Sequence, residues 1–260
     1  MCGIVGYIGT KPATDILISG LEKLEYRGYD SAGLATIWED KIHCLRAKGK
    51  LYNLKEKLKG LETPSQIGIG HTRWATHGKP EEYNAHPHLD SARRVAVVQN
   101  GIVENYRELR EELKSKGREF VSDTDTEVIP HLIADFLSSS DVKKSSSGSP
   151  FLEAVRQAVN RLEGAFALAM ICADYPNELI VARQQAPISI GLGQGEFLCA
   201  SDTPALISHT QAVVSLENGE MARLTNLGVE IYNFQGDRLN KVPRILNWSP
   251  TQVRSEERRV

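Results

Sequence analysis

Cysteine is scarce in this sequence: four occur among 260 residues, and none forms the C-x-x-C pair of a zinc or redox motif. Cys172 and Cys199 lie in apolar runs typical of strands, where a cysteine packs as a small hydrophobic side chain. Free thiols are usual in reducing compartments, so this cysteine usage predicts a cytoplasmic protein.

An excess of charge of one sign is also absent. The chain has 31 basic and 33 acidic residues, a net charge of -2, and so lacks the basic surplus usual in nucleic-acid-binding proteins. No apolar run approaches the roughly 18 residues of a membrane span. The N-terminus has no basic segment followed by an apolar signal core. We therefore expect neither a nucleic-acid nor a membrane partner, and no secretion.

Metal-binding patterns are missing as well. The seven histidines include His71, His77, His86 and His88, but no HExxH motif occurs and no Cys/His spacing fits a zinc site. We therefore predict chemistry without a metal ion.

The pattern of apolar residues predicts many strands and few helices. Strands are predicted over residues 4–9, 34–38, 41–47, 67–72, 95–99, 166–173, 179–183, 188–192, 197–201, 220–224 and 229–233. Helices are predicted over residues 12–24, 106–116, 126–137 and 151–162. Asn100-Gly101 is a turn signal at the end of one strand. This order favours an α+β sandwich over a doubly wound sheet.

Two segments carry no predicted chemistry. Residues 138–150 (SSSDVKKSSSGSP) form the one low-complexity stretch, for which we expect a flexible surface loop. Residues 254–260 (RSEERRV) lack apolar periodicity and resemble the translation of a sequencing adapter fused to a truncated reading frame. A non-native tail is our hypothesis for them, and a solvated charged tail is the alternative.

Cys2 is the most informative residue. Removal of Met1 would leave a thiol and a free α-amine on this one residue. An unperturbed α-amine has a pKa of about 7.7–8.0, which suits a base near neutrality. The thiolate is the attacking form of cysteine, so such a base would activate it. We expect an N-terminal nucleophile with its own base; if Met1 is retained, that base is lost. An incidental terminal cysteine is the alternative.

Polar groups that suit an amino-acid zwitterion occur further along. In the segment HTRWATHG after a predicted strand, Arg73 can hold a carboxylate through two parallel hydrogen bonds, with Thr76 and His77 beside it. Asp125 can bind an ammonium group. The alternatives are a surface position for Arg73 and a helix N-cap for Asp125.

Asn100 and Gly101 offer a side-chain amide and a backbone N–H. This is the kind of donor pair that forms an oxyanion hole.

Six separated motifs together resemble one family. They are CGIVG at residues 2–6, LEYRGYDSAG at 24–33, HTRWATHG at 71–78, NAHPH at 84–88, NGIVEN at 100–105 and SDTDTE at 122–127. In order and spacing they resemble the class II glutamine amidotransferases, and most closely the N-terminal glutaminase domain of the glucosamine-6-phosphate synthases. The resemblance covers about residues 2–253.

The resemblance implies a fold and a set of site residues. The fold is the four-layer αββα sandwich of the N-terminal-nucleophile hydrolases, with two antiparallel sheets. The implied roles are as follows: nucleophile, Cys2; oxyanion hole, Asn100 and Gly101; support of the nucleophile segment, Arg27; binding of the glutamine α-carboxylate, Arg73, Thr76 and His77; binding of its α-amine, Asp125; gating of ammonia, Trp74; neighbour of the site, His86.

The resemblance also implies an activity and partners. L-Glutamine would be hydrolysed to glutamate and ammonia through a γ-glutamyl thioester, without a cofactor. In the full-length family enzyme, a homodimer, the ammonia converts fructose 6-phosphate to glucosamine 6-phosphate on C-terminal sugar-isomerase domains.

The expected domain layout follows from the same resemblance. We place the glutaminase domain at residues 2–240 and the start of a linker at 241–253, and expect this chain to hydrolyse glutamine without making amino sugar. The alternatives are the glutaminase of another class II amidotransferase and a non-catalytic glutamine sensor. A pure sensor would need neither Cys2 nor the Asn100-Gly101 donors.

Overall fold

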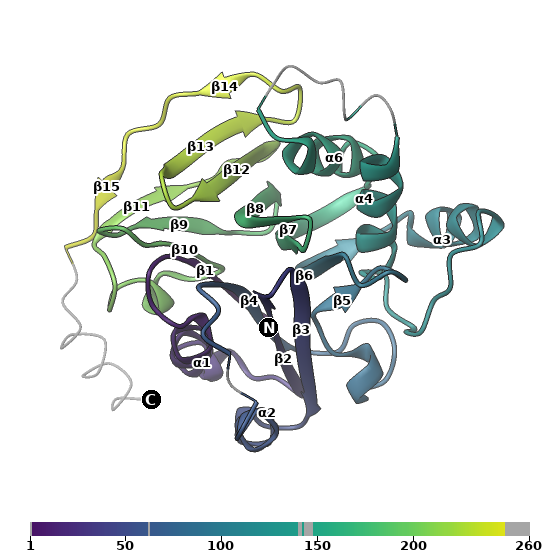
Figure 1. Cartoon of the computed structure of the whole chain (residues 1–260), viewed down its shortest axis with the longest axis horizontal. Coiled ribbons are helices and arrows are strands. Elements are labelled where there is room, and N and C mark those ends of the chain that lie inside the picture. Colours follow the sequence, from purple (N-terminus) through teal and green to yellow (C-terminus); the bar gives the residue numbers. More distant parts are fainter. Residues whose placement is uncertain (1, 62, 140–141, 143–147, 248–260) are drawn as a thin grey trace.

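The computed structural model describes residues 2–61, 63–139, 142 and 148–247. Two antiparallel sheets lie face to face, and helices cover the outer face of each (Figure 1). The predicted αββα sandwich is therefore confirmed. Residues 140–141 and 143–147 of the predicted loop, and the predicted tail at residues 254–260, lie outside the described residues.

The first sheet contains both ends of the described chain. Its eight described strands follow the order β15-β11-β9-β10-β1-β4-β2-β3. Their bounds are β1 (Gly3–Ile8), β2 (Ser31–Trp38), β3 (Lys41–Lys48), β4 (Ile67–Arg73), β9 (Ser189–Leu192), β10 (Phe197–Ala200), β11 (Ala212–Ser215) and β15 (Arg244–Ile245). The central strands β1 and β4 run antiparallel, so that Gly3 lies opposite Thr72.

The second sheet is built from the middle of the chain. Its seven described strands follow the order β14-β13-β12-β8-β7-β6-β5. Their bounds are β5 (His88–Leu89), β6 (Val95–Val103), β7 (Gly164–Cys172), β8 (Tyr175–Gln184), β12 (Glu220–Thr225), β13 (Gly228–Asn233) and β14 (Arg238–Leu239). Successive strands of this sheet are mostly sequence neighbours, as expected for antiparallel hairpins.

Helices cover the two outer faces. The bounds are α1 (Ala13–Glu22) and α2 (Leu51–Leu58) on the first sheet, α4 (Val128–Ser138) and α6 (Pro150–Val159) on the second, and α3 (Tyr106–Ser115) at its side (Figure 1). The described residues also form three short 3₁₀ turns, η1 (Glu25–Arg27), η2 (Glu82–Asn84) and η3 (Thr203–Ala205). None of the helices that the structure describes is long and apolar enough to cross a membrane.

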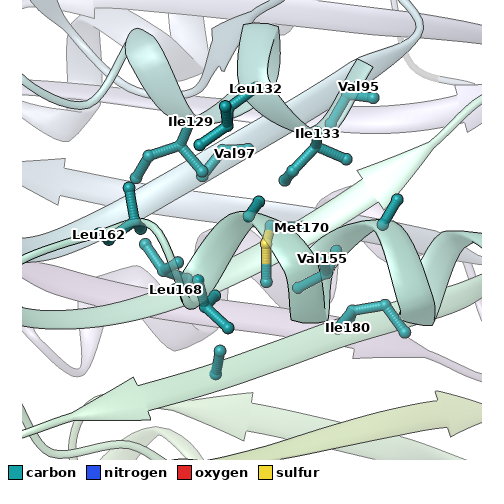
Figure 2. Close-up of a cluster of buried hydrophobic side chains, with 14 of the residues drawn as sticks. Val95, Val97, Ile129, Leu132, Ile133, Val155, Leu162, Leu168, Met170 and Ile180 are labelled. Carbon is teal, nitrogen blue, oxygen red and sulfur yellow. The ribbon is translucent and has the colours of Figure 1, made fainter. Parts of the chain in front are cut away.

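Strand alternation divides the apolar side chains between the layers. In β7, Phe166, Leu168 and Met170 point to the helices α4 and α6, while Ala167 and Ala169 point to the opposite sheet. Figure 2 shows the cluster beneath α4 and α6, to which Leu168 and Met170 of β7 and Ile129 and Leu132 of α4 all belong. Because side chains alternate along a strand, β7 contributes to both the core between the sheets and the core under the helices.

Each helix and strand that the sequence predicts is present within a few residues of its predicted bounds. The predicted turn at Asn100-Gly101 is wrong, because β6 continues through both residues to Val103 and stays paired with β7. Gly101 has a φ of 96°, which glycine adopts without strain, so the strand bends there instead of ending. The helix α2 and the strands β5, β11, β14 and β15 were not predicted.

Leu168→Ala tests the cluster beneath α4 and α6, because Leu168 is fully buried there. The lost burial and the remaining cavity should lower the free energy of unfolding by about 3 kcal/mol, measured by urea denaturation. The matched control is Leu227→Ala, since Leu227 is 98% exposed; it should change that free energy by less than about 0.5 kcal/mol. Equal losses in the two variants would contradict this assignment.

Candidate active site

The start of β1 and the ends of β4 and β6 meet at one edge of the sandwich. Antiparallel pairing puts the N-terminal end of β1 beside the C-terminal end of β4. Across the gap between the sheets, Nδ2 of Asn100 in β6 donates to the carbonyl oxygen of Cys2 at 3.2 Å. Residues far apart in the sequence therefore share one wall.

A cavity of about 440 Å³ opens at this edge. Nine of the residues that the sequence analysis named line it: Cys2, Arg27, Arg73, Trp74, Thr76, His86, Asn100, Gly101 and Asp125. His77 is outside this lining, but its Nδ1 lies 3.4 Å from Thr76 Oγ1 and 3.9 Å from Asp125 Oδ1. Gln99, Ile102, Thr124, Thr126, Ala186 and Pro187 also line the cavity and were not predicted.

The Cys2 thiol is held against the backbone at the end of β4. The Trp74 N–H donates to Cys2 Sγ at 3.2 Å. Burial raises the pKa of the thiol, while this N–H and the Arg73 charge favour the thiolate. The net direction is upward, so a neighbouring base is needed to generate the thiolate near neutral pH.

Contacts with Cys2, His71 and Ala165 hold Asn100 and Gly101 in place. Asn100 bridges Cys2 and His71, whose Nε2 lies 3.0 Å from Asn100 Oδ1. A Cβ on Gly101 would lie 2.0 Å from the Ala165 carbonyl oxygen, so only glycine fits against β7 here. Both residues line the cavity that Cys2 also lines.

Arg73 is buried rather than on the surface, with 3% of its area exposed. Its guanidinium donates to the carbonyl oxygens of His77 and of Lys79, the latter at 3.2 Å. These bonds fold the segment after β4 back over the arginine. A fixed guanidinium facing the cavity suits a carboxylate ligand, and the surface alternative is wrong.

Asp125 faces the cavity from the segment before α4. Its Oδ2 accepts from the Val103 N–H at 2.7 Å and from Gln99 Nε2 at 3.5 Å. The helix α4 has Glu127 at its N-cap, without a side-chain cap bond, so the N-cap alternative for Asp125 is wrong. Burial raises the pKa of this carboxyl, and a cationic ligand at Oδ1 would favour its charged form.

His86 contributes to the cavity wall through a directed hydrogen-bond chain. Its Nδ1 accepts from the Gln99 N–H at 3.2 Å, and its Nε2 lies 3.3 Å from Thr126 Oγ1. That hydroxyl donates to Gln99 Oε1 at 2.7 Å, which leaves Gln99 Nε2 to donate to Asp125. Burial lowers the pKa of His86 well below its ordinary value, so the ring is neutral. The chain orients Asp125.

Arg27 is anchored by residues that the sequence analysis missed. Its Nη1 donates to Ser201 Oγ at 3.4 Å and lies 3.9 Å from Asp202 Oδ2. Ser201 Oγ also accepts from the Ile4 N–H at 2.9 Å. Ser201 thus ties Arg27 to β1, the strand that begins directly after Cys2. No local pattern marks Ser201, since its partners are distant in the sequence.

Glu127 organises the segment that contains Asp125. Its carboxylate accepts from the Val121 N–H at 2.9 Å, from the Ser122 N–H at 2.7 Å and from the Ser122 hydroxyl. Burial alone would raise its pKa. The nearby His131 ring, whose Nε2 lies 3.7 Å from Oε1, and the hydrogen bonds from Ser122 and Val121 outweigh burial and lower the pKa to about 2. The sequence analysis quoted Glu127 within a motif without assigning it this role.

Trp74 stands at the mouth of the cavity, with 55% of its area exposed. Its backbone faces the thiol, while its indole lies over Gly28, where a Cβ would be 3.8 Å from the ring. A large aromatic group that is half in solvent at the entrance is placed to contact whatever enters or leaves.

A family model described as "Glutamine amidotransferase domain" matches residues 71–208 of the chain. This range covers more than half of the chain and includes most of the cavity lining.

Curated relatives match nearly the whole chain. It is 74% identical over 253 residues to a glutamine–fructose-6-phosphate aminotransferase (isomerizing) of Nostoc sp. (strain PCC 9229), covering 97% of this chain and 40% of that protein. It is 66% identical to the protein of the same name from Thermosynechococcus vestitus, covering 98% and 40%. The Clostridium perfringens protein is 48% identical, covering 96% and 39%. The chain spans about 40% of the length of such relatives.

Solved structures share the fold. The glutamine phosphoribosylpyrophosphate amidotransferase of B. subtilis, complexed with ADP and GMP, superposes with a TM-score of 0.73 at 26% identity, covering 90% of this chain and 49% of that one. A glutamine aminotransferase class-II domain protein from Silicibacter pomeroyi gives a TM-score of 0.58 at 16% identity, covering 90% and 99%. The fold is therefore that of the N-terminal-nucleophile amidotransferases.

Glu127→Gln tests the anchoring of the Asp125 segment. Because the folded state lowers the pKa from 4.5 to about 2, the charged carboxylate stabilises the protein fully above the unfolded value, and this stabilisation is lost as the pH falls toward 2. At pH 7 the free energy of unfolding of the variant should be about 2–3 kcal/mol lower than that of the wild type. Urea denaturation between pH 7 and pH 3 should show that the difference in unfolding free energy between wild type and variant becomes smaller below about pH 4.5.

The matched control is Glu111→Gln, since the Glu111 side chain is 74% exposed. It should change the free energy of unfolding by less than about 0.5 kcal/mol at every pH. If the stability difference between wild type and Glu127→Gln did not change with pH, that result would contradict the low pKa of Glu127.

Proposed function

This chain belongs to the glutamine amidotransferase family, and from that we propose that it hydrolyses L-glutamine to glutamate and ammonia with Cys2 as the nucleophile. One observation carries the proposal. The thiol of Cys2 and the amide of Asn100 share one cavity, with Asn100 Nδ2 only 3.2 Å from the Cys2 carbonyl oxygen. A nucleophile and an oxyanion donor that line one cavity are able to act on the same carbonyl carbon.

The first step forms the thioester. Once Met1 is removed, the α-amine of Cys2 takes the thiol proton, and Sγ attacks the side-chain amide carbon of glutamine. The base is needed because burial raises the pKa of this thiol. The carbonyl π bond becomes an oxyanion, which accepts hydrogen bonds from Asn100 Nδ2 and the Gly101 N–H. The C–N bond then breaks, and the α-ammonium returns its proton to the leaving NH₂, which departs as ammonia.

The second step releases glutamate. Water gives a proton to the α-amine and attacks the γ-glutamyl thioester carbon, and the same two donors stabilise the second oxyanion. The C–S bond breaks, and the thiolate recovers the proton. Every step uses groups of the chain, the substrate and water, so the reaction needs no cofactor.

The remaining site residues bind and orient the substrate. Arg73, with Thr76 and His77, binds the α-carboxylate, because its guanidinium is fixed by the segment that carries them. Asp125 binds the α-ammonium through Oδ1, since Oδ2 is already occupied by Val103 and Gln99.

Three further residues act around the reacting atoms. Arg27 supports the nucleophile strand through Ser201. His86 orients Asp125 through the hydrogen bonds of Gln99. Trp74, at the mouth of the cavity, gates the passage of ammonia.

In a full-length protein, the ammonia would convert fructose 6-phosphate to glucosamine 6-phosphate on sugar-isomerase domains, within a homodimer. The relatives named above as glutamine–fructose-6-phosphate aminotransferases, at up to 74% identity, support this assignment. We place the glutaminase domain at residues 2–240 and the start of the linker at 241–253; within the linker, β15 still pairs with β11. The four free cysteines support a cytoplasmic location.

Cys2→Ala tests the nucleophile. Purified chain whose N-terminus is shown by mass to be Cys2 should release glutamate from glutamine, and the variant should show no release above background, because it has no thiol to form the thioester. The matched control, Cys44→Ala, removes a thiol of β3 and should retain the activity. Stoichiometric glutamine binding without release by the mature wild-type chain would instead favour a sensor.

Asn100→Ala tests the oxyanion hole. Loss of this donor should reduce kcat by about 10²–10³-fold, with a smaller change in KM, because the bond is strongest when the oxyanion forms. Steady-state kinetics of glutamate release measure both constants. The control Asn177→Ala changes an exposed asparagine of β8 and should leave both constants unaltered. An increase in KM alone would assign Asn100 to substrate binding.

A further inference from the structure

The Asn100 amide has only one orientation that suits both of its neighbours. Its nitrogen and oxygen differ in what they offer, since Nδ2 donates and Oδ1 accepts. The Cys2 carbonyl oxygen can only accept, so the group 3.2 Å from it must be Nδ2. Oδ1 therefore faces His71 Nε2 at 3.0 Å, and this histidine nitrogen must carry a proton.

His71 is fully buried between the two sheets. It belongs to β4, is 0% exposed and contacts Asn100 of β6 in the opposite sheet. Its Nδ1 has no hydrogen-bond partner among the residues that the structure describes. Burial lowers the pKa of His71 to about 3 and outweighs the Asn100 amide and the Gln99 backbone, which favour the charged ring. The ring is therefore neutral, and its single proton lies on Nε2, where Asn100 Oδ1 accepts it.

The orientation of this ring is itself fixed. The His86 ring stacks on it with centroids 4.2 Å apart and an interplanar angle of 12°. His86 is held in turn by Gln99 and Thr126. Close approach of the His86 segment depends on Gly33 of β2, where a Cβ would lie 2.0 Å from the His86 carbonyl oxygen. His71 therefore has little freedom to rotate away from Asn100.

We propose that His71 is a positioning residue for glutamine hydrolysis: its Nε2–H donates to Asn100 Oδ1 and fixes the amide with Nδ2 toward the reacting carbonyl. This rests on the proposed function. Without the donor, a half-turn of the Asn100 amide brings Oδ1 to the place where the oxyanion forms. An oxygen there would repel the oxyanion instead of stabilising it.

Two substitutions at His71 separate donation from packing. His71→Leu fills the space without a donor, and kcat should fall by about 10–100-fold with KM changed less than about threefold. His71→Gln places a side-chain N–H near the position of Nε2, and kcat should recover to within about fivefold of wild type. Equal losses in the two variants would show a packing role and overturn the proposal.

Two controls test whether a loss of activity in His71→Leu comes from a disturbed β4 strand or from a less reactive Cys2 thiol. Thr72→Val changes the next residue of β4, whose buried hydroxyl has no partner among the described residues, and should leave kcat unchanged. Alkylation of Cys2 by iodoacetamide needs no oxyanion hole, so its rate in His71→Leu should stay within about twofold of wild type. A matching fall in alkylation, or in Thr72→Val activity, would overturn the proposal.

¹⁵N NMR of the histidine rings adds a measurement that does not need activity. In mature wild-type chain, with His71→Gln used to assign the signal, His71 should be the neutral Nε2–H tautomer at pH 7. An Nδ1–H tautomer or a charged ring would overturn the positioning proposal even in an active protein. An inactive wild type with the Nε2–H tautomer would reject the proposed function and keep the bond to Asn100.

Discussion

The antiparallel pairing of β1 with β4 is the contact on which the candidate site depends. It places Gly3 opposite Thr72, so Cys2 lies where Arg73 and Trp74 leave the sheet. A shift of one residue in this register would turn each side chain of β1 to the other face. The register is held by the core, because Ile4 and Ile8 lie between the sheets while Val5 and Tyr7 lie beneath α1 and α2.

The second sheet completes the site from the opposite side. Asn100 and Gly101 arrive because β6 continues past the Asn-Gly pair and bends at a residue that has no side chain. Asn100 then spans the gap between the sheets, with Cys2 on one side of its amide and His71 on the other. The nucleophile and the oxyanion donors therefore belong to different sheets, and the packing of the two sheets sets their separation.

The buried polar side chains from His86 to Asp125 form a hydrogen-bond network in which each donor and each acceptor is determined. The Gln99 N–H makes His86 Nδ1 an acceptor, and each following bond to Thr126, Gln99 and Asp125 is then determined. Glu127 remains charged although buried, since backbone N–H groups and a hydroxyl point at it. Such a network costs stability if one member is lost, and it keeps Asp125 and Asn100 oriented before substrate enters.

The sequence alone determined the order and type of most elements, since the periods of apolar residues at Leu17, Leu109 and Phe166 are local properties. It also brought Cys2, Arg73, Asn100 and Asp125 together as candidates, through motifs that resemble a known family. It did not reveal Ser201, Gln99 or His71 as supports, because their bonds join distant segments. Only the tertiary structure decided that Asn100-Gly101 lies inside a strand, since pairing with β7 outweighs the local turn preference.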